Sequence, residues 1–318
     1  MAVLGAGSGR VVDAMSGGKN HAGRSGWLIV LAPYIWLVAF FLAPFLIVAK
    51  ISLSQSTLMQ PPYVPLLDLD AGWAGLKDFV AALSLDNYVL LVTDAIYRAS
   101  YLKSLQVATL STGILLALGY PVAYALARAP RRWQAVLVLL VVLPFWTSFL
   151  IRVYAWINIL QRDGLLNQAL TALRLIHEPA TWLATDSAVY IGIVYSYFPF
   201  MVLPLYAALE RLDESLLEAA ADLGAPPWKA FFLVTVPLSW PGIAAGVLLC
   251  FIPIMGEFVI PDLLGSSATL MIGQTLWTEF FANRDWPAAA ALAVTLLAIL
   301  VVPILIYQRR EARALERA

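Results

Sequence analysis

The chain has little of the chemistry on which most enzymes depend. Its 318 residues include one cysteine, Cys250, and two histidines, His21 and His177. A single cysteine excludes a disulfide framework within the chain, and its apolar surroundings predict a buried packing residue. The sequence contains no His-Glu-x-x-His, Gly-x-Ser-x-Gly or Gly-x-x-x-x-Gly-Lys-Ser/Thr motif. An intramembrane enzyme is therefore disfavoured, and we expect neither a cofactor nor ATP to be bound by this chain itself.

Charged residues are also scarce. They make up 13% of the chain against 61% apolar residues, and the mean hydropathy is +0.81. This composition excludes an ordinary soluble protein. Lys and Arg together equal Asp and Glu at 20 each, so the net charge gives no reason to expect a nucleic-acid partner.

What the chain does have is long apolar runs. A hydrocarbon core of about 30 Å takes roughly 20 helical residues, and six segments reach that length. The strands of a closed barrel would alternate apolar and polar residues, and these runs do not. The sequence therefore predicts an all-α integral membrane protein with six transmembrane helices, at about 27–49, 100–127, 133–156, 187–209, 230–255 and 287–307.

The positions of Lys and Arg predict the orientation. These residues gather before residue 27, in the connections at 128–132 and 210–229, and after residue 307, whereas the longer loops on the other side collect Asp. By the positive-inside rule, both termini are then cytoplasmic. We expect a multi-pass protein of the bacterial inner membrane with an N-terminal tail at 1–26, a permease domain at 27–307 and a C-terminal tail at 308–318.

The cytoplasmic loop 210–229 contains an amphipathic helix, predicted over 213–223. Its carboxylates fall four residues apart on one face and its leucines on the other, and Gly224 ends it. Ser215 and Glu218 fit a capping box, so the helix could be a plain connector lying on the membrane surface. Against that reading, a carboxylate face is repelled by anionic lipid and suits a basic protein groove better.

Two spans are predicted to break at membrane depth. The third is interrupted at Leu143–Ser148, and the fifth at Ile252-Pro253, Gly256-Glu257 and Pro261-Asp262. Irregular backbone at this depth is tolerated only where it lines protein or a watery cavity. Lys103 and Arg152 lie near the outer ends of their spans and are expected to snorkel to the interface.

The 210–229 loop resembles the EAA loop of ABC importer permeases, through Glu218–Ala225, Val236–Leu238 and Pro241–Ile243. The resemblance covers nearly the whole chain past residue 27 and extends to polyamine importer permeases of the putrescine and spermidine type, with the putrescine permease subunit as the nearest match. It rests there on the segments 144–156, 199–206, 256–265 and 283–287.

The resemblance implies that the helix inserts into a groove on a separate ATPase subunit and transmits ATP-driven closure. The residues that it assigns to this coupling are Glu218, Ala219, Ala220, Asp222 and Gly224. It further implies a second homologous permease subunit, two ATPase subunits that bind ATP and Mg, and a periplasmic polyamine-binding protein. Putrescine is the expected substrate, with spermidine next.

A polyamine path needs carboxylates for the ammonium groups and aromatic faces for the cations and methylenes. Carboxylates inside a membrane are costly and usually functional. The candidate pathway residues are Glu257, Asp262, Trp146, Phe145, Tyr154, Tyr197 and Phe258. The alternative is that Asp262 and Glu279 are outer-loop residues and that the aromatics form interfacial belts. Arg152 is expected to be a structural or interfacial residue rather than a substrate contact, because its positive charge would repel a polyamine.

A rival function is that of a self-sufficient secondary transporter or channel for organic cations. Such a protein needs its own coupling-ion site and usually carries an inverted repeat. Neither is recognisable in the sequence, which favours the ATP-driven reading.

Overall fold

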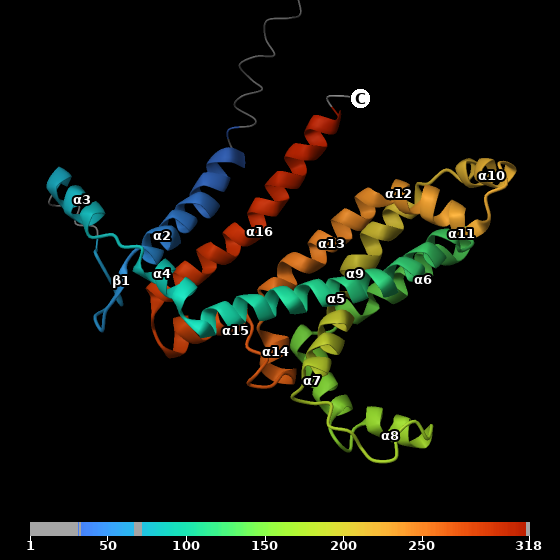
Figure 1. Ribbon diagram of the computed structural model, residues 1–318, viewed down its shortest axis with the longest axis horizontal. Coiled ribbons are helices and arrows are strands. Elements are labelled where there is room, and N and C mark those ends of the chain that lie inside the picture. Colours follow the sequence, from blue (N-terminus) through green and yellow to red (C-terminus); the bar gives the residue numbers. More distant parts are fainter. Residues whose placement is uncertain (1–30, 32, 67–71, 316–318) are drawn as a thin grey trace, which may run out of the picture.

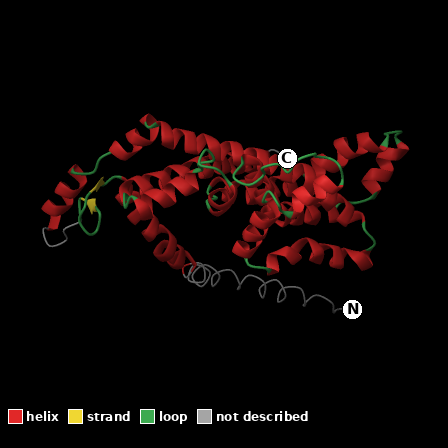
Figure 2. Ribbon diagram, turned by 90° about the horizontal axis from the view of Figure 1, so that it is seen from below, coloured by secondary structure: helices red, strands yellow, loops and turns green. Residues whose placement is uncertain are grey.

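The computed structural model describes residues 31, 33–66 and 72–315, and helices dominate it (Figures 1 and 2). Two short strands, β1 and β2, form an antiparallel hairpin in which Gln55 pairs with Val64. The elements are η1 Val38–Leu42, α2 Ala43–Ser52, β1 Gln55–Ser56, β2 Tyr63–Val64, α3 Gly72–Ala81, α4 Asp86–Thr93, α5 Ala95–Arg128, α6 Arg131–Val142, η2 Leu143–Trp146, α7 Phe149–Leu160, α8 Leu165–Ala172, α9 Asp186–Glu210, α10 Ser215–Asp222, α11 Pro227–Ala230, η3 Phe231–Thr235, α12 Val236–Leu238, α13 Trp240–Met255, α14 Val259–Leu264, α15 Ile272–Trp277, η4 Thr278–Ala282 and α16 Trp286–Leu315.

Five of the six predicted spans correspond to described helices long and apolar enough to cross a membrane, if each of two bent pairs counts as one span. Three are long and apolar enough to cross a membrane unbroken: Pro33–Ser52, α5 and α9. Two further spans are bent pairs, α6–η2 with α7 and α11–α12 with α13, and α16 contributes the shorter apolar stretch Trp286–Val301. The predicted start of the first span, at residue 27, lies outside the described residues. The last helix runs on to Leu315, past the predicted end of its span at 307.

The bends arise where the backbone cannot continue a helix. The third span bends by 88° after η2, where Thr147 and Ser148 are extended and Pro144 removes a backbone donor. The break predicted at Gly256-Glu257 is also confirmed, because α13 ends at Met255 and α14 begins at Val259. The interruptions predicted at Ile252-Pro253 and Pro261-Asp262 were wrong, because both pairs lie inside these helices. The fifth span has a second bend, of 65° at Ser239, which the sequence reasoning did not anticipate.

The core is a three-helix contact among α5, α9 and α13 (Figure 1). Small residues let α13 approach α9 closely. A Cβ atom added to Gly246 would lie 2.9 Å from the sulfur of Met201 and 3.2 Å from its carbonyl oxygen, so any larger side chain would push the helices apart. Cys250, on the same side of α13, is fully buried as predicted.

The N-terminal part of α5 is tied to its neighbours by polar side chains. The Lys103 ammonium lies 2.6 Å from an Asp186 carboxylate oxygen at the start of α9, and Thr269 donates to the other oxygen at 2.7 Å. Ser104 accepts a buried hydrogen bond from the Ile272 backbone N–H. Lys103 thus pairs with a carboxylate and holds α9 and the α14–α15 loop to α5, and its expected position at the membrane interface stays a prediction.

Candidate functional sites

The acidic helix α10 lies at the end of the molecule opposite the β-hairpin (Figure 1). It begins at Ser215, close to the predicted start, but the expected capping box is absent. Instead, Asp213 accepts a hydrogen bond from the Ser215 backbone N–H at 3.0 Å, which lowers the pKa of the Asp213 carboxyl. Ser215 is already the first helical residue, so a carboxylate two positions earlier takes the free backbone donor.

The other end of α10 stops as predicted. Gly224 has a φ of +77°; its N–H bonds to the Ala221 carbonyl, and the Ala225 N–H bonds to the Ala220 carbonyl. This pair of bonds is a Schellman motif, in which a residue with positive φ ends the helix without strain when it is glycine. The chain then enters α11 through Pro226 and Pro227.

The coupling residues predicted from the sequence lie together on α10, and most are exposed. Glu218, Ala219 and Asp222 face solvent, and Ala220 is half-buried. Leu223 is 89% exposed at the helix end. This short helix, capped at both ends, thus presents carboxylates beside an exposed leucine on a compact surface. A partner protein with a basic groove would fit such a surface.

The second candidate site is the break between α13 and α14, where Glu257 is buried with 8% exposure. One carboxylate oxygen accepts the Tyr197 hydroxyl of α9 at 2.6 Å, and the other accepts the backbone N–H groups of Val259 at 3.0 Å and Ile260 at 3.4 Å. Both oxygens are engaged, which compensates for burial of the group. Glu257 thereby satisfies the first backbone donors of α14 and joins the broken span to α9.

Aromatic contacts extend from the two neighbours of this carboxylate, its hydrogen-bond partner Tyr197 and the next residue in the chain, Phe258. Tyr197 packs with Phe200 at 6.1 Å between ring centroids, and Phe200 meets Phe145 edge-on at 5.0 Å. Phe258 stacks on Trp277 at 4.9 Å. Phe200 and Trp277 were missed in the sequence reasoning, since their contacts depend on how α9 and α15 pack against the breaks.

The other predicted pathway residues are not part of this cluster. Trp146 and Tyr154 are 75% and 54% exposed on the surface of the chain. Asp262 is exposed as well and accepts a hydrogen bond from Gln274 at 2.9 Å. The cluster around Glu257 therefore contains Phe145, Tyr197 and Phe258 from the predicted set.

Arg152 does not snorkel, contrary to expectation, but is buried with 9% exposure. It donates to the Pro144 carbonyl at 2.6 Å, and its guanidinium lies 4.8 Å from the centre of the Phe145 ring. The same carbonyl also accepts the Thr147 backbone N–H at 3.4 Å and the Thr147 hydroxyl at 2.8 Å. Arg152 reaches back from α7 and adds a third donor at this carbonyl. It thus holds the 88° bend of the third span closed, as a structural residue.

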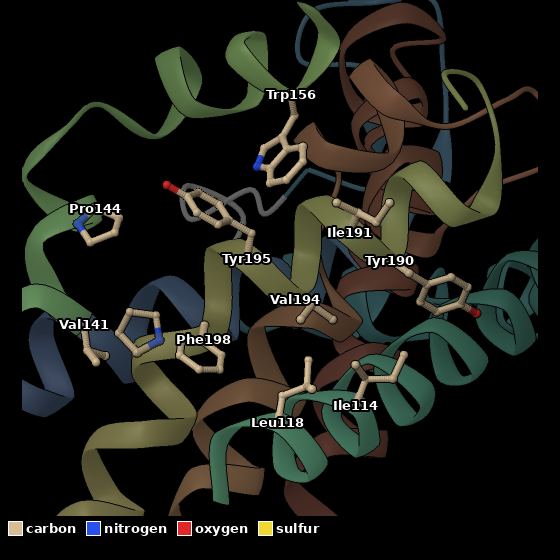
Figure 3. Close-up of a pocket in the computed structure, with 11 residues that line it drawn as sticks. Ile114, Leu118, Val141, Pro144, Trp156, Tyr190, Ile191, Val194, Tyr195 and Phe198 are labelled. Atoms are coloured by element: carbon tan, nitrogen blue, oxygen red, sulfur yellow. The ribbon is translucent and has the colours of Figure 1, made fainter. Parts of the chain in front are cut away.

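An apolar groove of about 450 Å³ lies on a different face of α9 (Figure 3). Tyr190, Val194 and Phe198 repeat every four residues on this face, whereas Tyr197 points elsewhere on the helix. The groove's lining residues include aromatic rings but no carboxylate, so it offers no negative charge to pair with an ammonium group. They are Ile114, Leu118, Val141, Pro144, Trp156, Tyr190, Ile191, Val194, Tyr195, Phe198 and Pro199.

Comparison with known proteins gives a consistent answer. Residues 112–310 match the family model described as "Binding-protein-dependent transport system inner membrane component". The chain is 44% identical over 226 residues to the spermidine/putrescine transport system permease protein PotB of Salmonella typhimurium, covering 71% of this chain and 78% of that protein. It is 37% identical over 276 residues to the Haemophilus influenzae PotB, covering 87% and 90%.

A solved structure shares the fold. A chain of a bacterial alginate ABC transporter, crystallised with its alginate-bound periplasmic protein, superposes with a TM-score of 0.69. The match covers 91% of this chain and 94% of that one at 16% sequence identity. At that identity the likeness establishes the arrangement of helices and no more.

Proposed function

The chain belongs to the family of binding-protein-dependent transport system inner membrane components, and we propose that within it this protein is the permease subunit of an ATP-driven importer of polyamines. The observation that carries the substrate is the 44% identity to a permease named for spermidine and putrescine. As a membrane component of such a system the chain is a non-catalytic subunit.

The chemistry of the Glu257 cluster supports this substrate class. A polyamine is a flexible alkyl chain with two or more ammonium groups, and a buried carboxylate bonded to a tyrosine, with further aromatic contacts extending from its neighbours, is suited to both parts. In the structure Tyr197 occupies one oxygen of Glu257. We assign Glu257 to the path as a closed site, in which a substrate ammonium takes the place of the Tyr197 hydroxyl.

The remaining aromatic and acidic candidates would line the path outside that cluster. Trp146 and Tyr154 are exposed on this chain, and Asp262 is exposed beside Gln274. Exposed side chains at membrane depth suit a path that is completed by another subunit. Putrescine remains our preferred substrate and spermidine the second, and the two are to be compared directly.

The partners follow from the exposed α10 surface and from the family. We propose a second homologous permease, two ATPase subunits that bind ATP and Mg, and a periplasmic polyamine-binding protein. One ATPase would grip α10 around Glu218, Ala219, Ala220, Asp222 and Gly224. In this arrangement both termini, with the tails at 1–26 and 308–318, lie in the cytoplasm of the bacterium.

The test is uptake of radiolabelled putrescine and spermidine by proteoliposomes, measured with and without ATP. We expect uptake only when the permease pair, the ATPase and the binding protein are all present. Substantial uptake by vesicles that contain this chain alone would favour the secondary transporter instead. Export rather than import under ATP would contradict the proposed direction.

A further inference from the structure

The entrance to α10 is joined to the end of α5 by an ion pair. A nitrogen of Arg128, the last residue of α5, lies 2.6 Å from a carboxylate oxygen of Glu214, just before α10 begins. The two side chains are 25% and 73% exposed. An exposed ion pair contributes little to folding stability, so its loss is expected to leave the fold intact.

Behind this ion pair, aromatic rings continue the contact between α5 and the fifth span. The Arg128 guanidinium lies 5.6 Å from the centre of the Tyr124 ring. Tyr124 and Tyr120 both meet Phe231 of η3 edge-on, at 5.6 and 5.5 Å. Edge-to-face packing of this kind fixes the relative placement of the elements that carry the rings.

The contact ends at the bend of the fifth span. The Tyr120 hydroxyl and the Ser239 hydroxyl lie 2.8 Å apart in a buried hydrogen bond, and Ser239 is the residue at which the span turns by 65°. The inner part of α5 therefore contacts the 214–238 segment at its start and in its middle, and it contacts Ser239, the bend that directly follows the segment.

From these three contacts we propose that α5 is a second arm of force transmission. The inner part of α5, residues 120–128, moves as one body with the segment 214–238 and holds the bend at Ser239 fixed. Movement of α10 then reaches the core through α5 as well as through the fifth span. The inference rests on the proposed function, in which an ATPase drives α10, and it adds Arg128, Tyr120 and Ser239 as positioning residues.

The physical reason for two arms lies in the shape of the fifth span. A span that bends by 65° transmits a push poorly along its axis, because the bend can flex. Fixing the bend from the side with a 34-residue helix, about 50 Å long at 1.5 Å per residue, supplies the stiffness that the bend lacks. The same long helix packs against α9 and α13 in the core.

The test is a charge swap in the reconstituted complex, read as substrate molecules taken up per ATP hydrolysed. Arg128→Glu and Glu214→Arg are each expected to lower this ratio about fivefold, the lower range of couplings between sites. The double variant Arg128→Glu/Glu214→Arg should restore it, because the pair re-forms with its signs exchanged. Arg131→Glu is the control, since it adds the same charge to the exposed start of α6.

The other end of the contact has its own matched pair of variants. Tyr120→Phe keeps the ring but removes the bond to Ser239, and it is expected to lower the same ratio. Tyr124→Phe removes a hydroxyl that makes no hydrogen bond with the described residues, and it should behave as wild type. The ATPase should co-purify with every variant. This control distinguishes a loss of coupling from a loss of ATPase binding.

The outcomes separate the two proposals. Single variants with the wild-type ratio, or a double variant as defective as the singles, would overturn the α5 arm and leave the proposed function standing. A wild-type complex without ATP-driven uptake, or without an ATPase on α10, would remove both.

Discussion

Replacing Glu257 by glutamine removes a charge at the break in the fifth span while keeping nearly the same shape. The glutamine amide oxygen can still accept the Val259 and Ile260 N–H groups, and its NH₂ can donate to the Tyr197 hydroxyl, which now acts as acceptor. The number of hydrogen bonds in the cluster is therefore preserved, and the folded protein should reach the membrane in normal amounts.

The effect on transport is set by the lost charge. Two unit charges 4 Å apart attract by roughly 4 kcal/mol at an effective dielectric constant of about 20, which is a ceiling. A hydrogen bond to a charged group has a net value of about 1.5–3 kcal/mol. We therefore expect Glu257→Gln to lower polyamine uptake at limiting substrate by about 10- to 100-fold, at 1.4 kcal/mol for each factor of ten.

The matched control is Glu279→Gln. Glu279, in η4, also accepts a tyrosine hydroxyl, from Tyr97 at 3.0 Å, together with the Asn283 amide at 2.8 Å, and it makes no hydrogen bond to the α13–α14 break within the described residues. Uptake of labelled putrescine and spermidine is measured alongside protein level and thermal stability. Wild-type uptake by Glu257→Gln at normal protein level would show that the carboxylate is only a cap for α14 and refute its place on the path.

Three shorter predictions follow. Gly224→Val, which forces a branched residue to a φ of +77° at about 1–2 kcal/mol, should reduce uptake per ATP while the subunits still assemble; unchanged coupling would make α10 a passive connector. Gly246→Val should lower thermal stability by about 1–3 kcal/mol through overpacking, whereas Gly113→Val, with nothing within 4 Å of the added atom, should not; equal melting of the two would contradict the packing. A reporter at Leu175 should lie outside the cytoplasm and one at Ala225 inside, and the reverse would invert the topology.

The sequence predicted features that depend on local backbone chemistry. Proline and glycine mark the breaks at 143–148 and at Gly256, and the positive φ of Gly224 follows from its place after an amphipathic run. Helix ends and breaks are decided by the few residues around them, so such signals remain readable without tertiary structure.

Contacts between segments that are far apart in the sequence were not predicted. Tyr197 and Glu257 were both named as candidates, yet their hydrogen bond joins residues 60 positions apart and depends on α9 packing against α13. Lys103 was assigned to the interface from its place in α5, and its partner Asp186, which comes from another helix, was not predicted. An isolated span gives no information about which charge lies opposite it.

The two candidate sites are connected through α13. This helix begins beside the Ser239 bend and ends at Met255, just before Glu257, and its 16 residues form a rod about 24 Å long. It packs on α9, whose far end leads into α10. A push on α10 therefore acts on α9 and α13 together, and any sliding between them would strain the Tyr197–Glu257 bond across their interface.

The single cysteine of the chain is a natural probe of that sliding. The Cys250 sulfur is fully buried on α13, 3.7 Å from the Tyr197 carbonyl oxygen of α9. If the interface opens during the cycle, a small thiol reagent should label Cys250 at least about tenfold faster during ATP turnover than at rest, which corresponds to about 1.4 kcal/mol of opening free energy. Labelling is located by mass spectrometry, and Cys250→Ser supplies the blank. Equal labelling in every nucleotide state would show that α9 and α13 stay closed, and the path from α10 to Glu257 would then have to run through another pair of helices.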